Sequence, residues 1–202
     1  MVGICIYSDR NFYTSVAVFS KVIVIICPGI YYLDHYSSMI SQIKTGKHHA
    51  ESKAETTIIM MPSDANPKGN VFGGIILKYV DLIAGLVAKR HSGHANIVTA
   101  SIDRMTFLKP VFIGNALILS ARLNYVRKSS MEVEVNVEAE DLDDNTRVDT
   151  GTAFVTTVAL DKYGKPIEVP PLIIENDDDK KRFSDGESRM LARLKDAGKL
   201  ES

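Results

Sequence analysis

The length, composition and charge of this chain already exclude several classes of protein. Its 202 residues, 45% of them hydrophobic, can bury one ordinary core, and we expect a single domain with terminal extensions. The formal net charge of −1 gives no reason to expect a nucleic-acid or membrane partner, because such proteins concentrate Lys and Arg on one face. The two cysteines, Cys5 and Cys27, lie outside the expected domain and offer it neither a disulfide framework nor a zinc site. This cysteine usage fits a cytoplasmic protein.

Residues 1–54 differ from the rest of the chain and are expected to form an N-terminal extension. Within them, Val16–Cys27 is apolar apart from two residues, and Pro28 and Gly29 end the run. A transmembrane helix needs about 20 apolar residues, so this run is too short to span a membrane. It also lacks the basic start and the clear cleavage site of a secretory signal. Three interpretations stay open: a poorly ordered or packed-on extension, residues added upstream of a true start near Met39, and a targeting segment.

The predicted elements begin near Glu55. Thr56–Met61 is a short β-type run, and Pro62–Gly69 is rich in turn formers. Gly73–Arg90 is too long and too continuous for a strand, and the basic residues and glycine after it are typical helix stop signals. Four longer β-type segments follow, with connections too short for crossover helices, so we expect mainly antiparallel pairing. These segments are Ile97–Phe107, Ala116–Val126, Met131–Glu140 and Thr150–Leu160.

Hydrophobic patterning indicates how these elements pack. The Gly73–Arg90 helix has only a narrow polar stripe, so most of its surface must be covered. Met131–Glu140 alternates apolar and polar residues along its whole length, which predicts a strand with one dry and one wet face. The sequence therefore predicts an α+β fold, in which a curved antiparallel sheet wraps around one long central helix within residues 55–172.

Residues 173–202 are expected to form a C-terminal tail with an additional amphipathic helix. The segment from Asp177 to Ala197 has an acidic start, basic later turns and a glycine after its end, all of which suit a helix. Its apolar stripe is thin, formed by Phe183, Met190, Leu191 and Leu194. We interpret it as a solvated helix, in preference to one that docks on a neighbouring subunit.

The stretch from Pro62 to Asp81 has the layout of a functional site. A polar loop presents Asn66, and Gly73 and Gly74 allow a ligand to approach the backbone closely. The helix that begins there offers unpaired N–H groups to an oxyanion, and Asp81 can transfer a proton. Chemistry on a carbonyl group is the function that these residues favour.

Each of these residues also has a simpler explanation. Asp81 could pair with Lys78 on a solvated helix face. Asn66 precedes Pro67 among turn formers, where an Asx turn is ordinary. The two glycines could serve only helix entry or tight packing, and both roles can coexist.

The ordered motifs of the chain resemble the acyl-CoA hydrolase branch of the hotdog-fold thioesterases. The resemblance extends in unbroken order from Glu55 to Leu172. It rests on Met61–Asn66, Gly69, Phe72–Gly74, Asp81, Met105–Pro110, Gly114, Ser129–Ser130 and Glu168–Pro171.

This resemblance implies hydrolysis of acyl-CoA to a carboxylic acid and free CoA, without metal or organic cofactor. Asp81 would act as general base on water or, alternatively, as nucleophile, and Asn66 would orient the water or the carbonyl group. The N–H of Gly74, possibly together with that of Gly73, would stabilise the oxyanion. The resemblance also implies a homodimer whose sheets join edge to edge, so that Asn66 of one subunit meets Asp81 of the other. A trimer of dimers stays open as a higher assembly.

Candidates for binding CoA are basic residues and a polar turn: Arg90, Lys109, Arg127, Lys128, Ser129 and Ser130. Ordinary surface roles are equally compatible with the basic residues. His91 and His94, at the helix exit, are interpreted as cap or surface residues. Two other functions stay open, namely a non-catalytic acyl-CoA sensor and a hotdog hydratase or dehydratase. The latter requires a histidine near the helix, and the helix contains none in its interior.

Overall fold

The computed structural model describes residues 23–26, 29–32, 46–93, 96–103 and 105–198. The chain divides into two units, residues 1–44 and 45–202. In the first unit, β1 (Ile23–Ile26) and β2 (Gly29–Tyr32) pair as an antiparallel hairpin. Most of the apolar run Val16–Cys27, and the alternative start at Met39, lie outside the described residues.

The second unit is built on a five-stranded, fully antiparallel sheet. Its strands are β4 (Ala54–Ile59), β5 (Asn96–Asp103), β6 (Ala116–Arg127), β7 (Ser130–Glu140) and β8 (Arg147–Leu160), in the order β4-β6-β7-β8-β5. Two short 3₁₀ helices, η1 (His49–Glu51) and η2 (Pro62–Asp64), flank β4. A small parallel pair, β3 (Lys47–His48) with β9 (Leu172–Ile173), joins the two ends of this unit. β4 and β5 are therefore the two edges of the main sheet.

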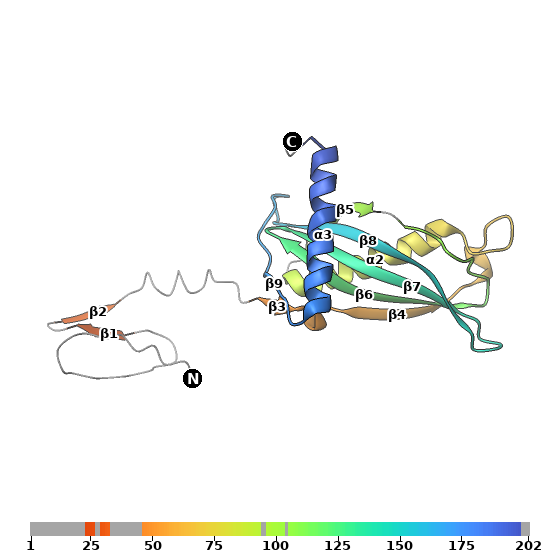
Figure 1. Ribbon diagram of the computed structural model, residues 1–202, viewed down its shortest axis with the longest axis horizontal. Coiled ribbons are helices and arrows are strands. Elements are labelled where there is room, and N and C mark those ends of the chain that lie inside the picture. Colours follow the sequence, from red (N-terminus) through yellow and green to blue (C-terminus); the bar gives the residue numbers. More distant parts are fainter. Residues whose placement is uncertain (1–22, 27–28, 33–45, 94–95, 104, 199–202) are drawn as a thin grey trace. The chain divides into compact units, whose positions relative to one another are not determined.

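One long helix, α2 (Gly73–Ser92), packs its apolar face on the inner side of the curved sheet (Figure 1). Val80, Ala84 and Val87 of this helix are fully buried against inward side chains such as Leu119 and Val135. Gly93, in the left-handed conformation, caps the helix C-terminus. The predicted hotdog architecture, a curved antiparallel sheet around one long helix, is confirmed.

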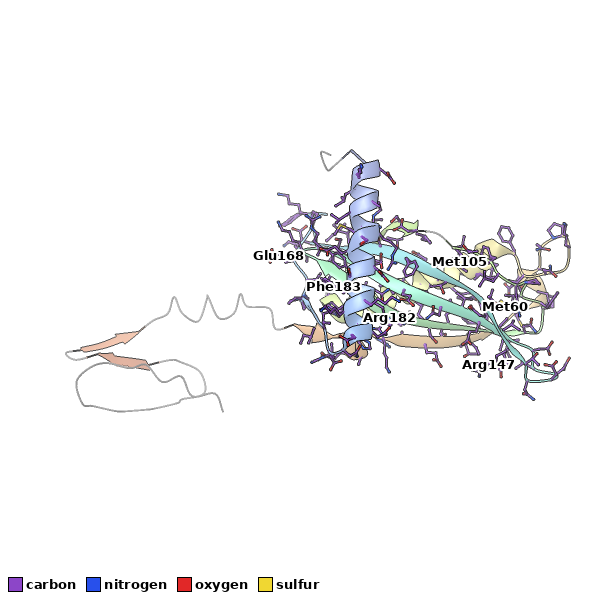
Figure 2. The ribbon with its side chains drawn as sticks, in the orientation of Figure 1. Met60, Met105, Arg147, Glu168, Arg182 and Phe183 are labelled. Carbon is purple, nitrogen blue, oxygen red and sulfur yellow. The ribbon has the colours of Figure 1, made fainter. Side chains whose placement is uncertain are left out.

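The second helix, α3 (Asp177–Asp196), crosses the opposite face of the sheet (Figure 1). Its contacts show that the interpretation of a solvated tail helix was wrong. Glu132 and Glu134, expected on a wet face, are only 2% and 7% exposed beneath it. Arginines of α3 neutralise these carboxylates, and Phe183 packs on Tyr125 of β6. Figure 2 labels Arg182 and Phe183 where α3 crosses the sheet. The thin apolar stripe is sufficient because charged pairs carry much of the contact.

One strand boundary also differs from the sequence-based expectation. β5 ends at Asp103, whereas the β-type run had been expected to continue to Phe107. Residues 105–110 are irregular and lead toward the helix N-terminus. Neither of the two described α-helices is both long and apolar enough to cross a membrane.

Candidate functional site

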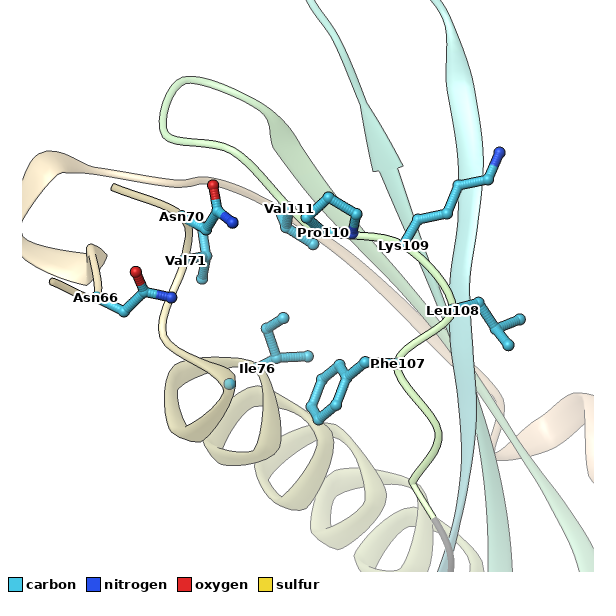
Figure 3. A pocket seen from close by; sticks show the side chains of 10 residues that line it. Asn66, Asn70, Val71, Ile76, Phe107, Leu108, Lys109, Pro110 and Val111 are labelled. Atoms are coloured by element: carbon cyan, nitrogen blue, oxygen red, sulfur yellow. The ribbon is translucent and has the colours of Figure 1, made fainter. Parts of the chain in front are cut away.

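An open cleft of about 320 Å³ lies at the N-terminus of α2 (Figure 3). Three segments that are distant in sequence form it: the polar loop before α2, the first turn of α2 and the loop after β5. The lining residues are Asn66, Asn70, Val71, Gly73, Ile76, Phe107, Leu108, Lys109, Pro110 and Val111. Apolar side chains accompanied by a few polar ones, here the carboxamides of Asn66 and Asn70, are typical of a ligand pocket.

Asn66 serves both of the roles considered from the sequence. Its Oδ1 accepts the N–H of Lys68 at 2.8 Å, which is an Asx turn, and its own N–H donates to the carbonyl of Asn70 at 2.6 Å. Because Oδ1 accepts a backbone N–H, the orientation of the carboxamide follows from the hydrogen-bond network. Nδ2 is then directed toward the cleft (Figure 3). The turn therefore fixes a donor that a bound carbonyl or water can use.

The first turn of α2 supplies further donors. Phe72 donates its N–H to the carbonyl of Asp64, and Ile75 donates to Phe72, both at 2.8 Å. Gly73 and Gly74 between them occupy helical positions for which the helix itself offers no acceptor. Gly73 lines the cleft, whereas the ring of Phe72 lies over Gly74 so closely that an added Cβ would overlap it. Gly73 is thus the glycine that lines the cleft, and Gly74 has a packing role against Phe72.

Asp81 lies seven residues beyond Gly74, roughly 10 Å further along the helix axis. Its Oδ1 accepts the hydroxyl of Thr99 in β5 at 2.6 Å. No ion pair joins Asp81 to Lys78 among the described residues, and the Lys78 ammonium lies 5.5 Å from the centre of the Tyr79 ring. Asp81 is half-buried, with its second carboxylate oxygen left for another partner. The sequence analysis did not identify Thr99 as a site residue, because it is one of several hydroxyl-bearing residues in a β-type run.

A single chain does not bring Asn66 and Asp81 into one cleft, because Asp81 is not among the residues that line it. Asp81 instead lies beside β5, an edge strand of the sheet. Apolar side chains around this edge are unusually exposed: Leu82 57%, Leu86 42%, Val98 44% and Ile102 38%. The part of α2 that was expected to be covered is therefore left open along the same edge as Asp81.

The candidate CoA-binding residues are divided between the two ends of α2. Lys109 belongs to the cleft, although its ammonium group points away from the cavity (Figure 3). Arg90, near the helix C-terminus, donates from Nη1 to the carbonyl of Lys53 at 3.0 Å. The turn between β6 and β7 lies at the same end of α2 as Arg90. The carbonyl oxygen of Lys128 in this turn accepts the N–H of Val169, and the next residue, Pro170, contacts His91 near the end of α2.

The turn itself is well fixed. Lys128 has a positive φ of 45°, and the hydroxyl of Ser130 donates to the carbonyl of Arg127 at 3.2 Å. The carbonyl of Ser129 accepts the N–H of Ala159 at 2.9 Å, and Arg127 Nη1 lies 3.6 Å from Met190 Sδ. The side chains of Lys128 and Ser129 remain available for a ligand.

His91 has a structural role and is not a surface residue as expected. It is fully buried, and its Nε2 lies 2.9 Å from the carbonyl oxygen of Pro170. Burial lowers the pKa of this imidazole below its ordinary value, so the ring is neutral near pH 7. His94 lies outside the described residues.

The described residues contain one group with the spacing of metal ligands, formed by His49, Glu175 and Asp179. Arg122 donates to Asp179 Oδ1 at 2.5 Å, so a cation already occupies that carboxylate. The backbone N–H of Glu175 donates to the other oxygen of Asp179. The group is therefore an ion-pair cluster at the start of α3, and it is remote from the cleft lining.

Comparisons with known proteins agree with this architecture. Residues 68–145 match the model of the thioesterase superfamily. The chain is 40% identical over 129 residues to the uncharacterized acyl-CoA thioester hydrolase YkhA of Bacillus subtilis, covering 64% of this chain and 74% of that protein. The chain belongs to the thioesterase superfamily, and the resemblance to its acyl-CoA hydrolase branch is confirmed.

Two further relatives show how the chain compares in length and fold. The cytosolic acyl coenzyme A thioester hydrolase of Rattus norvegicus is 38% identical over 157 residues, which is 76% of this chain but 41% of the rat protein. The chain thus spans about two fifths of that relative. A crystal structure of an apo-hexameric acyl-CoA thioesterase superposes with a TM-score of 0.71 at 35% identity, covering 76% of this chain and 97% of the other.

Proposed function

We propose that this protein hydrolyses acyl-CoA thioesters to carboxylic acids and CoA, at sites that two copies of the chain build together. The activity is assigned to residues 55–172, in the cytoplasm, with CoA as part of the substrate and no further cofactor. The observation that carries the proposal is the division of the site. Asn66 and Gly73 line one cleft, while Asp81 lies on an open, apolar edge about two helical turns away.

The edge formed by β5 provides the means of completing the site. An edge strand has unpaired N–H and C=O groups that a second β5 can satisfy, and the exposed side chains of Leu82, Leu86 and Val98 would be buried in the same contact. In an antiparallel, two-fold pairing, the C-terminal end of one α2 lies beside the N-terminal end of the other. Asp81 of each chain then approaches the cleft of its partner. The hexameric relative supports such an assembly, and a trimer of dimers is its simplest form.

The same pairing brings together the divided basic residues. Arg90 and the turn Arg127–Ser130 belong to the far end of α2, which would lie near the partner's cleft and its Lys109. Cationic side chains and turn N–H groups bind phosphates and pyrophosphate. We propose that these residues hold the CoA moiety, while the apolar wall near Ile76 and Phe107 receives the acyl chain.

In the proposed reaction, Asp81 removes a proton from water as the oxygen attacks the thioester carbon. Thr99 holds one oxygen of Asp81, so the other is oriented toward the water. The carbonyl oxygen becomes negative and accepts hydrogen bonds from Asn66 Nδ2 and from the N–H of Gly74, together with that of Gly73, aided by the helix dipole. The C–S bond then breaks, and the CoA thiolate receives the proton. Direct attack by the carboxylate of Asp81 is the alternative first step.

Replacement of Asp81 by alanine tests the role of this carboxylate. We expect Asp81→Ala to fold but to release thiol from acyl-CoA at least about a hundredfold more slowly, since loss of a general base typically costs ~10²–10⁴. Thiol release should be measured over a series of acyl chain lengths. Lys78→Ala, on the same exposed side of α2, is the matched control and should retain activity. Near-normal turnover by Asp81→Ala would remove Asp81 from the mechanism.

Mixing two inactive variants tests whether the site is shared. Under conditions that allow subunit exchange, Asn66→Ala mixed with Asp81→Ala should regain activity, with up to one intact site per heterodimer. Each variant incubated alone is the control and should stay inactive. If exchange is demonstrated by mass spectrometry and no activity returns, the site is built within one chain.

A further inference from the structure

The loop that forms one wall of the cleft is supported by an irregularity in β8. We call residues 105–111 the wall loop, since its members from Phe107 to Val111 supply half of the lining residues. The pairing of β7 with β8 is regular up to Val137 and Gly151, then shifts, so that Thr150 is an extra residue in β8. The Thr150 carbonyl oxygen, released from the ladder, accepts the N–H of Leu108 at 2.8 Å.

Gly151 allows the wall loop to approach β8 this closely. Its φ is +154°, in the region that side-chain-bearing residues rarely adopt. A Cβ at this position would overlap the carbonyl oxygen of Thr106, and it would lie 3.3 Å from the Thr106 carbonyl carbon and 3.5 Å from Met105 Cε. The first two of these atoms are backbone, so the side chain of Met105 alone cannot relieve the overlap. The loop would have to move.

The position of the loop is transmitted directly to the cleft. Phe107 follows Thr106, and its ring tip is only 3.4 Å from the place of a Cβ on Gly73, at the opposite wall. Figure 3 shows the ring between the wall loop and the first turn of α2. The separation of the two walls therefore depends on how near Thr106 lies to β8.

We propose that Gly151 is a positioning residue that sets the width of the acyl-CoA cleft. It acts through the contact of the wall loop with the bulge at Thr150, and it touches no substrate itself. This inference rests on the proposed function for the identity of the substrate. It predicts that a single methyl group on β8, at a residue that does not line the cavity, alters which acyl chains are accepted.

The test compares Gly151→Ala with Gly164→Ala. Gly164 also has a positive φ, +79°, but no atom lies within 4 Å of its Cβ position, so Gly164→Ala introduces backbone strain without a collision. For Gly151→Ala we expect kcat/KM to fall roughly tenfold to a hundredfold, with a raised KM and a changed order of preference between short and long acyl-CoAs. Mere destabilisation would lower apparent kcat equally for all substrates and leave KM unchanged.

Hydrogen exchange provides a measurement that requires no activity. In the parent protein the Leu108 N–H is bonded to Thr150, and we expect peptides covering the wall loop to exchange faster in Gly151→Ala but not in Gly164→Ala. Should Gly151→Ala fail to fold, Leu108→Pro removes the same hydrogen bond; because Leu108 itself lines the cleft, the expected readout is faster exchange across the wall loop. If the parent hydrolyses no acyl-CoA, the proposed function is wrong, while the exchange comparison still decides the role of Gly151. Equal exchange in both glycine variants, or unchanged substrate preference, would overturn the inference.

Discussion

The two helices cover opposite faces of one sheet by different physical means. α2 buries an apolar face whose central residues, such as Val80 and Val87, are completely removed from solvent. α3 has a much more polar sequence, yet it buries Glu132 and Glu134 of β7 almost as completely. Packing on the inner face depends on the hydrophobic effect, whereas packing on the outer face depends on charge pairing around a few apolar contacts.

The outer contact is a series of arginine–carboxylate pairs between α3 and three strands, β6, β7 and β5. Arg122 on β6 binds Asp179, and two arginines of α3 bind the glutamates of β7, Arg182 with Glu134 at 2.6 Å and Arg189 with Glu132 at 2.7 Å. Arg193 reaches Asp103 at the end of β5. These pairs attach α3 to the strand that carries Thr99 and precedes the wall loop, so the outer face also supports the candidate site.

Apolar and aromatic contacts occur at defined places between the pairs. The ring of Phe183 packs on Tyr125 with a centroid distance of 4.7 Å, and the Arg189 guanidinium lies 3.7 Å from the centre of the Phe154 ring. At Gly186, a Cβ would lie 2.8 Å from Tyr125 Cβ, so only glycine allows the helix this near to the sheet. The comparison of the two faces shows what an alternating strand pattern can predict. It indicates which residues share a face of the sheet, but it does not indicate whether that face is exposed to solvent.

The largest difference between the faces should appear when the Arg189–Glu132 pair is broken. Arg189→Met leaves the Glu132 carboxylate, which is 2% exposed, without its cation. We expect a loss of about 3 kcal/mol in the free energy of unfolding, at the low end for a buried pair because the Arg189 side chain is 30% exposed. Urea denaturation measured by circular dichroism provides the value.

The double variant Arg189→Met with Glu132→Met is the decisive comparison. Removing both charges should recover most of the lost stability, since an apolar pair of similar volume can replace a buried ion pair. On the inner face, Leu119→Ala should lower the free energy of unfolding by about 2–5 kcal/mol, because it leaves a cavity. A second substitution that shortens a neighbouring side chain would enlarge this cavity and cannot restore the lost stability. A double variant as unstable as Arg189→Met alone would contradict the view that charge pairing decides the outer contact.

The sequence predicted the inner half of the molecule well for a physical reason. Burial on one face of a strand or helix imposes a period that a single sequence shows, so the sheet and α2 were found with boundaries close to those observed. α3 was recognised as a helix, but its docking was not predicted. Its partners Glu132 and Glu134 are more than forty residues away and have the same pattern as solvated residues.

In the candidate site, too, the sequence identified residues marked by local patterns but not those whose roles depend on contacts distant in sequence. Asn66, the two glycines and Asp81 were found because residue type, spacing and family resemblance mark them. Thr99 was missed, because its role depends on a hydrogen bond between β5 and α2, eighteen residues apart in sequence. Gly151 was also missed, because a contact with the carbonyl of Thr106 leaves no trace in the residues around either position.

A smaller difference between the faces should be visible in the dependence of stability on pH. His91, on the inner side, has a pKa lowered chiefly by burial. His49, beside Asp179 at the start of α3, also has a pKa lowered by burial and by Arg122, but nearby Asp179 and Glu175 act in the opposite direction. A histidine with a lowered pKa binds its proton more readily in the unfolded chain. Its neutral form therefore contributes stability above about pH 6.5, the ordinary value, and this is lost as the pH falls toward the folded pKa.

Glutamine variants of the two histidines separate these contributions. In urea denaturation between pH 7.5 and 5, we expect the parent protein to lose up to about 1.4 kcal/mol per pH unit for each such histidine. His91→Gln should reduce this slope more than His49→Gln, because His91 is completely buried whereas the side chain of His49 is 19% exposed and has two acidic neighbours. For the carboxylates of the outer face, Glu134 and Asp179, burial acts to raise the pKa, but the hydrogen bonds and positive charges around them together lower it below its ordinary value, so their contribution is lost only at more acidic pH. A slope that depends more on His49 than on His91 would mean that the outer cluster, and not the buried end of α2, responds first to acid.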